Sequence, residues 1–213
     1  MKDLVLSIFP SIDLLGRAFE EEGFCVVRGP DLLWGGDIRK FHPPTGVFEG
    51  VIGGPPCKGE SNLAFMNGKA GETMAPEFHR VVAEAKPEWW LMEAVKRHSA
   101  PYVLKLSPRY IGEKQSRRRF FHSNLNLVPY IEVALFEHPV FKYCVRASNR
   151  TGSQGTHKKR QSSYSFQEMC ELQGLPEDFN LPGFKMDGKF EAVGNGVPLP
   201  MGRAIAKAIK SAR

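Results

Sequence analysis

Short apolar runs alternate with amphipathic stretches over the first hundred residues. Four runs have the length and the apolar content of buried strands, at residues 3–9, 24–29, 48–54 and 88–95. Between them, residues 13–23 and 75–86 repeat apolar side chains at helical spacing, and the first of these helices is expected to end at Gly23. Strands and helices that alternate in this way predict a parallel sheet with helices on its faces.

The pattern changes after residue 100. Residues 101–123 predict two strands that are joined by a polar turn. Residues 123–150 mix aromatic and basic side chains without a clear period, and residues 151–163 have the polar, glycine-containing composition of a loop. The second half therefore departs from the simple alternation of the first.

Two helices are expected at the end of the chain. Residues 165–179 place apolar side chains on one helical face, with Ser165 as the N-cap and Glu168 three residues later, which is the pattern of a capping box. The last segment, 201–213, has the spacing of a short amphipathic helix.

Composition narrows the class of protein. A chain of 213 residues with 42% hydrophobic and 24% charged residues is long enough to bury a real core and is not typical of a disordered protein. It contains no apolar run of 18 residues and begins without a signal-peptide pattern, so we expect a cytoplasmic protein with no membrane partner. The four cysteines form no Cys-x-x-Cys pair, which predicts neither a metal site nor a disulfide framework.

Positive charge is concentrated in the middle of the chain. Residues 96–160 hold fourteen Lys and Arg against three acids, a local net charge of +11 where the whole chain carries +6. Such a block is typical of a surface that faces a polyanion, although a solvated face without a partner would have the same composition.

Cys57 follows a predicted strand and a rigid turn, Gly53-Gly54-Pro55-Pro56. Ligands of open α/β sheets bind beyond the carboxyl ends of the strands, so a cysteine at this position can act as a nucleophile. The alternative is a buried cysteine that packs as a small hydrophobic side chain.

Four short motifs support the first interpretation of Cys57. They are Gly-Gly-Pro-Pro-Cys at 53–57, Glu-Ala-Val at 93–95, Gln-Ser-Arg-Arg-Arg at 115–119 and Gly-Asn-Gly-Val-Pro at 194–198. In this order they resemble the motifs of the cytosine-C5 DNA methyltransferases. Leu-Gln-Gly-Leu-Pro at 172–176 and the turn that starts at Phe9 resemble further motifs of that family, so the resemblance extends over residues 4–210.

The resemblance implies a fold and a division of the chain. The fold is that of the S-adenosylmethionine-dependent methyltransferases: a Rossmann-like α/β fold with a mixed, seven-stranded sheet, helices on both faces and a minimal basic target-recognition lobe. We expect a catalytic and cofactor-binding core over 1–119, a reduced target-recognition region over 120–160 and C-terminal helices that return to the core over 161–213. The short chain suits a phage-like member of the family.

The resemblance also implies the roles of individual residues. Cys57 would add to C6 of a flipped cytosine, Glu93 would hold N3 and the exocyclic amine, Arg119 would pair with O2, and Arg117 would support the loop. S-adenosylmethionine is the implied cofactor. The residues expected around it are Phe9, Ser11, Ile12, Asp31, Asp37, Met74, Asn195 and Val197. For Phe9, Ile12, Met74 and Val197, simple core packing is the alternative.

Double-stranded DNA is the implied partner, with a monomeric enzyme. The expected DNA contacts are Lys58, Ser61, Gln115, Arg146, Arg150, Lys158, Lys159 and Arg160. Few base-reading groups are available among them, so a short or relaxed target is expected.

The sequence departs from the family at several positions. Ser11 and Asp13 stand where the family has glycines, so the turn must differ or must tolerate small polar residues. Asp31 is one residue out of register for the acid that grips the ribose. Ala94 replaces the Asn of Glu-Asn-Val, which organises the loop and Glu93 in the family.

The sequence therefore predicts a DNA (cytosine-5-)-methyltransferase in a bacterial or phage-infected cell. Two alternatives stay open: a weak or inactive relative that binds DNA as a module, and a tRNA cytosine-5 methyltransferase. A member of a restriction-modification system, with its endonuclease on another chain, is a further possibility.

Overall fold

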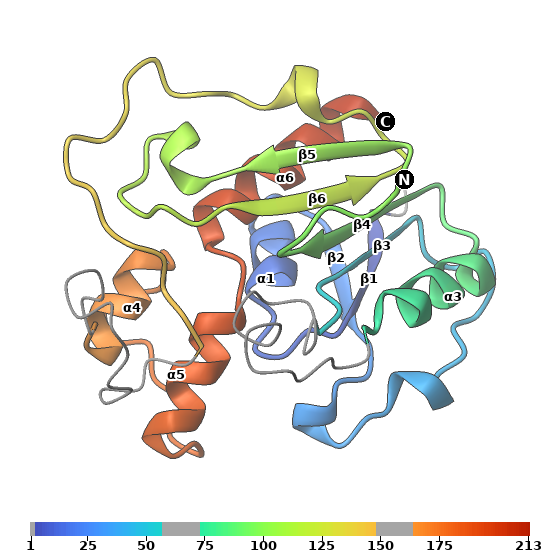
Figure 1. The fold of residues 1–213 in the computed structure, drawn as a ribbon. Helices are drawn as coiled ribbons and strands as arrows, with labels where there is room; N and C mark the ends of the chain where they lie inside the picture. Colours follow the sequence, from blue (N-terminus) through green and yellow to red (C-terminus); the bar gives the residue numbers. More distant parts are fainter. Residues whose placement is uncertain (1–2, 57–72, 148–163) are drawn as a thin grey trace.

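The computed structural model describes residues 3–56, 73–147 and 164–213, and their six strands form one sheet in the order β2-β1-β3-β4-β6-β5 (Figure 1). The strands are β1 (Leu4–Ile8), β2 (Cys25–Arg28), β3 (Gly50–Gly53), β4 (Trp89–Ala94), β5 (Tyr102–Leu106) and β6 (Arg119–Ser123). Strands β1 to β4 pair in parallel, whereas β6 pairs antiparallel with both β4 and β5. The predicted mixed sheet is confirmed, with six strands in the described residues where seven were expected.

Helices cover both faces of this sheet. They are α1 (Leu14–Glu21), α3 (Ala75–Ala85), α4 (Phe166–Leu172), α5 (Met186–Asn195) and α6 (Leu199–Ala212). Four 3-10 turns accompany them, η1 (Leu32–Trp34), η2 (Ile38–Lys40), η3 (Pro108–Ile111) and η4 (Val128–Tyr130). None of the helices described is long and apolar enough to cross a membrane.

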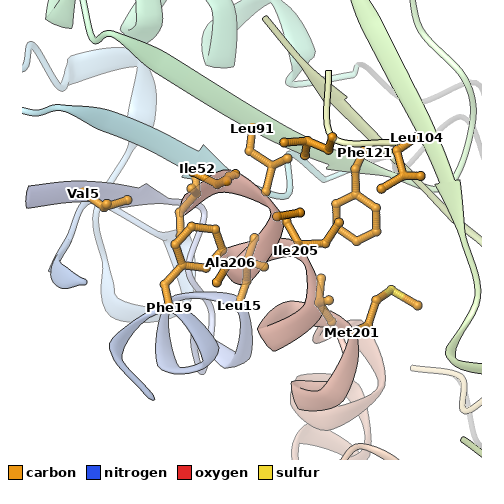
Figure 2. Packing of buried hydrophobic residues seen from close by; sticks show 14 of the residues in the cluster. Val5, Leu15, Phe19, Ile52, Leu91, Leu104, Phe121, Met201, Ile205 and Ala206 are labelled. Carbon is orange, nitrogen blue, oxygen red and sulfur yellow. The ribbon is translucent and has the colours of Figure 1, made fainter. Parts of the chain in front are cut away.

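Period-two alternation along the strands builds a core on each face. Val5, Ile52 and Leu91 point toward α1 and α6, where they pack with Phe19 and Ile205 (Figure 2). Their neighbours in the same strands, including Leu6, Val51 and Met92, pack on the other face against Phe78 and Val81 of α3. A third cluster joins α4 and α5 to the N-terminal end of α1 through Leu14, Met169, Val193 and Leu199.

The ends of two predicted helices are where local signals put them. Gly23 follows the end of α1 with a left-handed φ of 87°, which glycine adopts without a steric penalty. The capping box of α4 is complete: Ser165 Oγ accepts the Glu168 N–H at 3.2 Å, and Glu168 Oε2 accepts the Ser165 N–H at 2.7 Å.

Helix α5 was not predicted. It contains Gly188 and ends next to Gly194, and glycine lowers helix propensity by about 1 kcal/mol relative to alanine. Tertiary contacts stabilise it instead, because Phe190 packs edge-on against Phe166 of α4 at a centroid distance of 6.1 Å.

Candidate active site

The predicted site residues gather at one edge of the sheet. In the parallel register Ile8 lies beside Gly53, and Gly53 lies beside Met92. The turn after β1, the Gly-Pro turn after β3 and Glu93 near the end of β4 therefore share the carboxyl edge, where ligands of open α/β sheets bind. Cys57, Lys58 and Ser61 lie outside the described residues, which reach Pro56 before the first gap.

Glu93 and Arg119 form an ion pair at this edge. Arg119 Nε lies 2.7 Å from Glu93 Oε1, and the two side chains are only 13% and 12% exposed. The pairing of β4 with β6 sets this contact, since Glu93 lies opposite Phe121, two residues from Arg119. A Cβ on Gly54 would lie 3.2 Å from Glu93 Oε2, so the carboxylate also lies directly beside the turn that leads to Cys57.

This pair presents a carboxylate and a guanidinium with a fixed mutual orientation. A carboxylate accepts hydrogen bonds when ionised and donates one when protonated, whereas a guanidinium only donates. Together they match a planar ligand that carries a donor and an acceptor on one edge, and low exposure strengthens both interactions.

Arg117 has a different environment from Arg119. It is 2% exposed, and its NH1 and NH2 groups donate to the carbonyls of Val145 at 2.6 Å and Gly194 at 2.9 Å. Burial, with the charge of Arg119, lowers the pKa of Arg117 to about 10. Because both terminal nitrogens of Arg117 are bonded to backbone carbonyls, this side chain supports the loops around the site and is poorly placed to contact a substrate.

Gln115 is buried in the same way. Its Nε2 donates to Leu172 O at 2.7 Å and to Gln173 Oε1 at 3.3 Å, and its Oε1 accepts the Val145 N–H at 3.1 Å. At 1% exposure it cannot reach a nucleic acid in this conformation. This burial argues against the predicted DNA contact and makes Gln115 a positioning residue.

Gln173, which the sequence analysis assigned no role, completes this buried network. It is fully buried, and its Nε2 donates to Val193 O at 2.7 Å and to Gly196 O at 2.9 Å. Arg117 and Gln173 thus hold the backbone of 193–196, which contains the start of the Gly-Asn-Gly-Val-Pro motif. Gln173 belongs to the Leu-Gln-Gly motif, so the sequence marked the position. The motif alone does not show that the side-chain amide of Gln173 faces the interior.

The turn after β1 keeps a left-handed backbone despite the missing glycines. Phe9, Ser11 and Asp13 have φ values of 56°, 53° and 52°. Asp31 Oδ2 accepts the Ser11 N–H at 2.9 Å, and Trp34 Nε1 donates to Ser11 O at 2.8 Å. The turn therefore tolerates small polar residues, and Asp31 supports it from the next loop.

Asp13 uses its side chain to fix the start of α1. Its carboxylate accepts the Ser7 hydroxyl at 2.8 Å and the Gly16 N–H at 3.0 Å, and Arg28 Nε lies 2.9 Å away. Burial raises the pKa of Asp13, while Ser7, Arg28 and Gly16 oppose that effect.

The other residues expected near the cofactor differ in their surroundings. Asp37 is paired with Arg39 at 2.8 Å, which lowers the pKa of Asp37. Phe9 and Met74 pack against the hydrophobic cluster between the sheet and α3, and Ile12 packs against the cluster that joins α4 and α5 to α1. Val197 is buried in the cluster between the sheet, α1 and α6, whereas Asn195 is exposed. Their roles at the cofactor stay predictions.

The basic block is only partly available to a polyanion. Arg109 pairs with Glu137 at 2.6 Å and Lys114 with Glu171 at 2.8 Å, which neutralises two of its charges. Arg146 is exposed, as a phosphate contact requires. Arg150, Lys158, Lys159 and Arg160 lie outside the described residues.

Within the described ranges no three His, Cys, Asp or Glu side chains come close enough to hold a metal ion. The same ranges contain Cys25, Cys144 and Cys170 as free thiols. Burial raises the pKa of Cys170 to about 11, so it is not an activated nucleophile.

Comparison with known proteins shows a similar family and similar folds. The model of the C-5 cytosine-specific DNA methylase family matches residues 108–211, and no match is found among curated proteins. Among solved structures, the Entamoeba histolytica methyltransferase EhMeth is similar with a TM-score of 0.64 and 12% identity, over 98% of each chain.

Two further structures have the same fold. A candidate DNA modification methyltransferase from an Escherichia coli prophage gives a TM-score of 0.62 at 14% identity, over 98% of this chain and 99% of its own. Spodoptera frugiperda DNMT2 gives 0.62 at 14% identity, over 97% and 98%. At these identities the likeness establishes the fold, and the methyl donor of the matched family is S-adenosylmethionine. The match over residues 108–211 confirms the predicted resemblance to the C-5 cytosine-specific DNA methylase family.

Proposed function

We propose that the chain is a DNA (cytosine-5-)-methyltransferase that acts on a flipped cytosine. The observation that carries the proposal is the Glu93–Arg119 pair, which lies beside Gly54 in the turn that follows β3. In the sequence Gly54 precedes Cys57 by three positions. Its carboxylate suits the N3 and amine edge of cytosine, and its guanidinium suits O2. The target base must leave the stack, because C5 and C6 are inaccessible within a duplex.

The chemistry follows from these groups. The thiolate of Cys57 forms a bond to C6, and Glu93 donates a proton to N3, so the electrons of the C5–C6 bond become available at C5. S-adenosylmethionine supplies an electrophilic methyl group on its sulfonium. Transfer of the methyl group to C5 would leave a neutral thioether in place of the sulfonium, and N3 would return its proton to Glu93. Loss of the C5 proton to a base would then restore the C5–C6 double bond and release the thiolate of Cys57. Among the residues expected to hold S-adenosylmethionine, Phe9, Ser11 and Ile12 belong to the turn after β1, and Asp31 supports that turn.

The direct test is transfer of a labelled methyl group from S-adenosylmethionine to unmethylated genomic DNA, with tRNA assayed in parallel. Cys57→Ser should abolish transfer, whereas Cys25→Ser, at an exposed position of β2, should retain it. Digestion of the product should yield 5-methylcytosine. Retained transfer by Cys57→Ser would overturn the mechanism.

The alternatives give different results in the same assay. Label in tRNA alone would assign the enzyme to RNA. Absence of transfer to either substrate, together with DNA binding that weakens steeply with salt, would identify a binding module, because phosphate contacts release counterions.

A further inference from the structure

A buried histidine lies behind Glu93 on the neighbouring strand. His122 of β6 is fully buried and pairs with Met92, the residue before Glu93. Its Nδ1 lies 3.1 Å from Met92 O, and its Nε2 accepts the backbone N–H of His98 at 2.9 Å. Because a backbone N–H can only donate, Nε2 must be the unprotonated nitrogen, and Nδ1 carries the proton toward Met92 O.

These two hydrogen bonds reach both sides of the Glu-Ala-Val motif. Met92 precedes Glu93 in β4, and His98 lies in the loop that follows Val95. One imidazole therefore ties the strand before the carboxylate to the loop after it.

Ala94 cannot itself supply a side-chain hydrogen bond to the loop that follows β4. The sequence carries alanine where the resembled motif has asparagine, and the Ala94 methyl group, 1% exposed, cannot hydrogen-bond the loop. The bond from the His98 N–H to His122 is one of the interactions that connect the 95–98 loop to the sheet.

We infer that His122 is a positioning residue that fixes the backbone around Glu93 and replaces the organising side chain that Ala94 lacks. The inference rests on the proposed function for its catalytic consequence, but not for the hydrogen bonds themselves. A carboxylate displaced by about 1 Å from its reacting partner can cost ~100-fold in rate.

The surroundings of His122 make the link sensitive to acid. The titratable groups that face it are His98, at a ring distance of 5.4 Å, Arg97 of the same loop and His79 of α3. Burial lowers the pKa of His122, the bond to Met92 O opposes this, and the three cations or imidazoles lower it further. The neutral form is therefore present at neutral pH, and protonation of Nε2 in acid removes the acceptor for His98.

The lowered pKa of His122 also determines how the stability of the protein depends on pH. The unfolded histidine binds a proton more readily than the folded one, so the stabilising contribution is complete above the unfolded pKa of about 6.5. It is lost as the pH falls through the lowered pKa of the folded state.

The test compares two substitutions at one position. His122→Gln can keep both bonds, with its amide N–H toward Met92 O and its oxygen toward His98, but it does not titrate. His122→Leu keeps the volume and loses both bonds. We expect His122→Leu to lower kcat ~10–100-fold with little change in KM for DNA, and His122→Gln to retain kcat within ~5-fold and to lose the acid limb of the kcat–pH profile.

His79→Gln is the matched control, because its pKa is also lowered by burial but it makes no hydrogen bond in the described structure to the 95–98 loop. It should keep an acid limb, at a slightly higher pH than in the parent because His79 no longer lowers the pKa of His122. An unchanged kcat in His122→Leu, or an unchanged acid limb in His122→Gln, would overturn the inference. If His122→Leu does not fold, the profile of His122→Gln decides.

A readout without turnover separates this inference from the proposed function. Nitrogen NMR of labelled histidine should report the Nδ1–H form of His122 at neutral pH, and the protection of the His98 amide, relative to its intrinsic exchange rate at each pH, should fall as His122 protonates. A parent protein with no methyl transfer but with this coupled behaviour would refute the proposed function alone. A protected His98 amide that ignores the protonation of His122 would refute the inference.

Discussion

Gln173→Leu is expected to destabilise the protein by about 1–3 kcal/mol, because Gln173 donates both amide hydrogens to backbone carbonyls inside the core. The substitution leaves Gly196 O without its donor and leaves Val193 O with only the longer bond from the Gly196 N–H at 3.3 Å. A buried carbonyl that loses its partner costs about 1–3 kcal/mol, and a second lost bond adds about 1 kcal/mol. The better burial of leucine returns roughly 1 kcal/mol.

Urea denaturation at neutral pH measures this change directly. For a chain of this size a loss of 1 kcal/mol lowers Tm by about 2–4 °C, so a decrease of roughly 2–12 °C is expected in a thermal scan. Gln167→Leu is the matched control, because Gln167 is exposed in α4, the helix that ends just before Gln173, and it should change stability by no more than about 0.5 kcal/mol. Equal effects at the two positions would refute the argument that burial decides the cost.

The double variant with Gln115→Leu tests whether the two amides act as one network. Gln115 Nε2 donates to Gln173 Oε1 at 3.3 Å, so part of the loss is shared between the single variants. The double variant should be less destabilised than the sum of the two by about 0.5–1.5 kcal/mol. Strict additivity would mean that the 3.3 Å contact contributes nothing.

Ser11→Gly should stabilise the protein by about 1 kcal/mol in urea denaturation, because a left-handed φ of 53° strains any residue with a Cβ; a loss of stability would show that the hydroxyl makes a stronger contact. Gly202→Ala should destabilise by about 1–3 kcal/mol although alanine favours helices, since the new Cβ would lie 2.6 Å from a Cβ of α1. Gly183→Ala, with open space around the new Cβ, should be neutral in the same melt. Cys25 should react with iodoacetamide at about pH 8 well before Cys170, whose thiol is buried with a pKa of about 11, and mass spectrometry would contradict this if both were labelled equally.

The sequence predicted those parts of the fold that depend on neighbours in the chain. The capping box at Ser165 and the helix end at Gly23 involve residues within a few positions of one another, and both are confirmed. Helix α5 was missed because Gly188 weakens its local signal, and what stabilises it is the contact between Phe190 and Phe166, which no local pattern contains.

In the candidate site, residues that belong to motifs could be predicted from the sequence, whereas contacts between distant residues could not. Glu93 and Arg119 were identified by motifs, and the antiparallel pairing of β4 with β6 brings them within 2.7 Å. The inward direction of Gln115 was not predictable, because an amide in a basic segment suits a nucleic-acid contact as well as a buried network. The bond from His98 to His122 was not predictable either, since it joins residues 24 positions apart without a motif.

The turn after β1 shows how a missing motif can leave a backbone unchanged. Glycine favours φ values above zero, and its absence at Ser11 and Asp13 costs about 1–2 kcal/mol per residue. Both residues nevertheless adopt left-handed φ values near 50°, because contacts elsewhere offset the cost. Asp31 and Trp34 bind the two backbone polar groups of Ser11, and the Asp13 carboxylate caps α1. Hydrogen bonds here fix a conformation that glycine adopts without steric strain. The absence of the glycine pattern from the sequence therefore does not imply that the turn is absent.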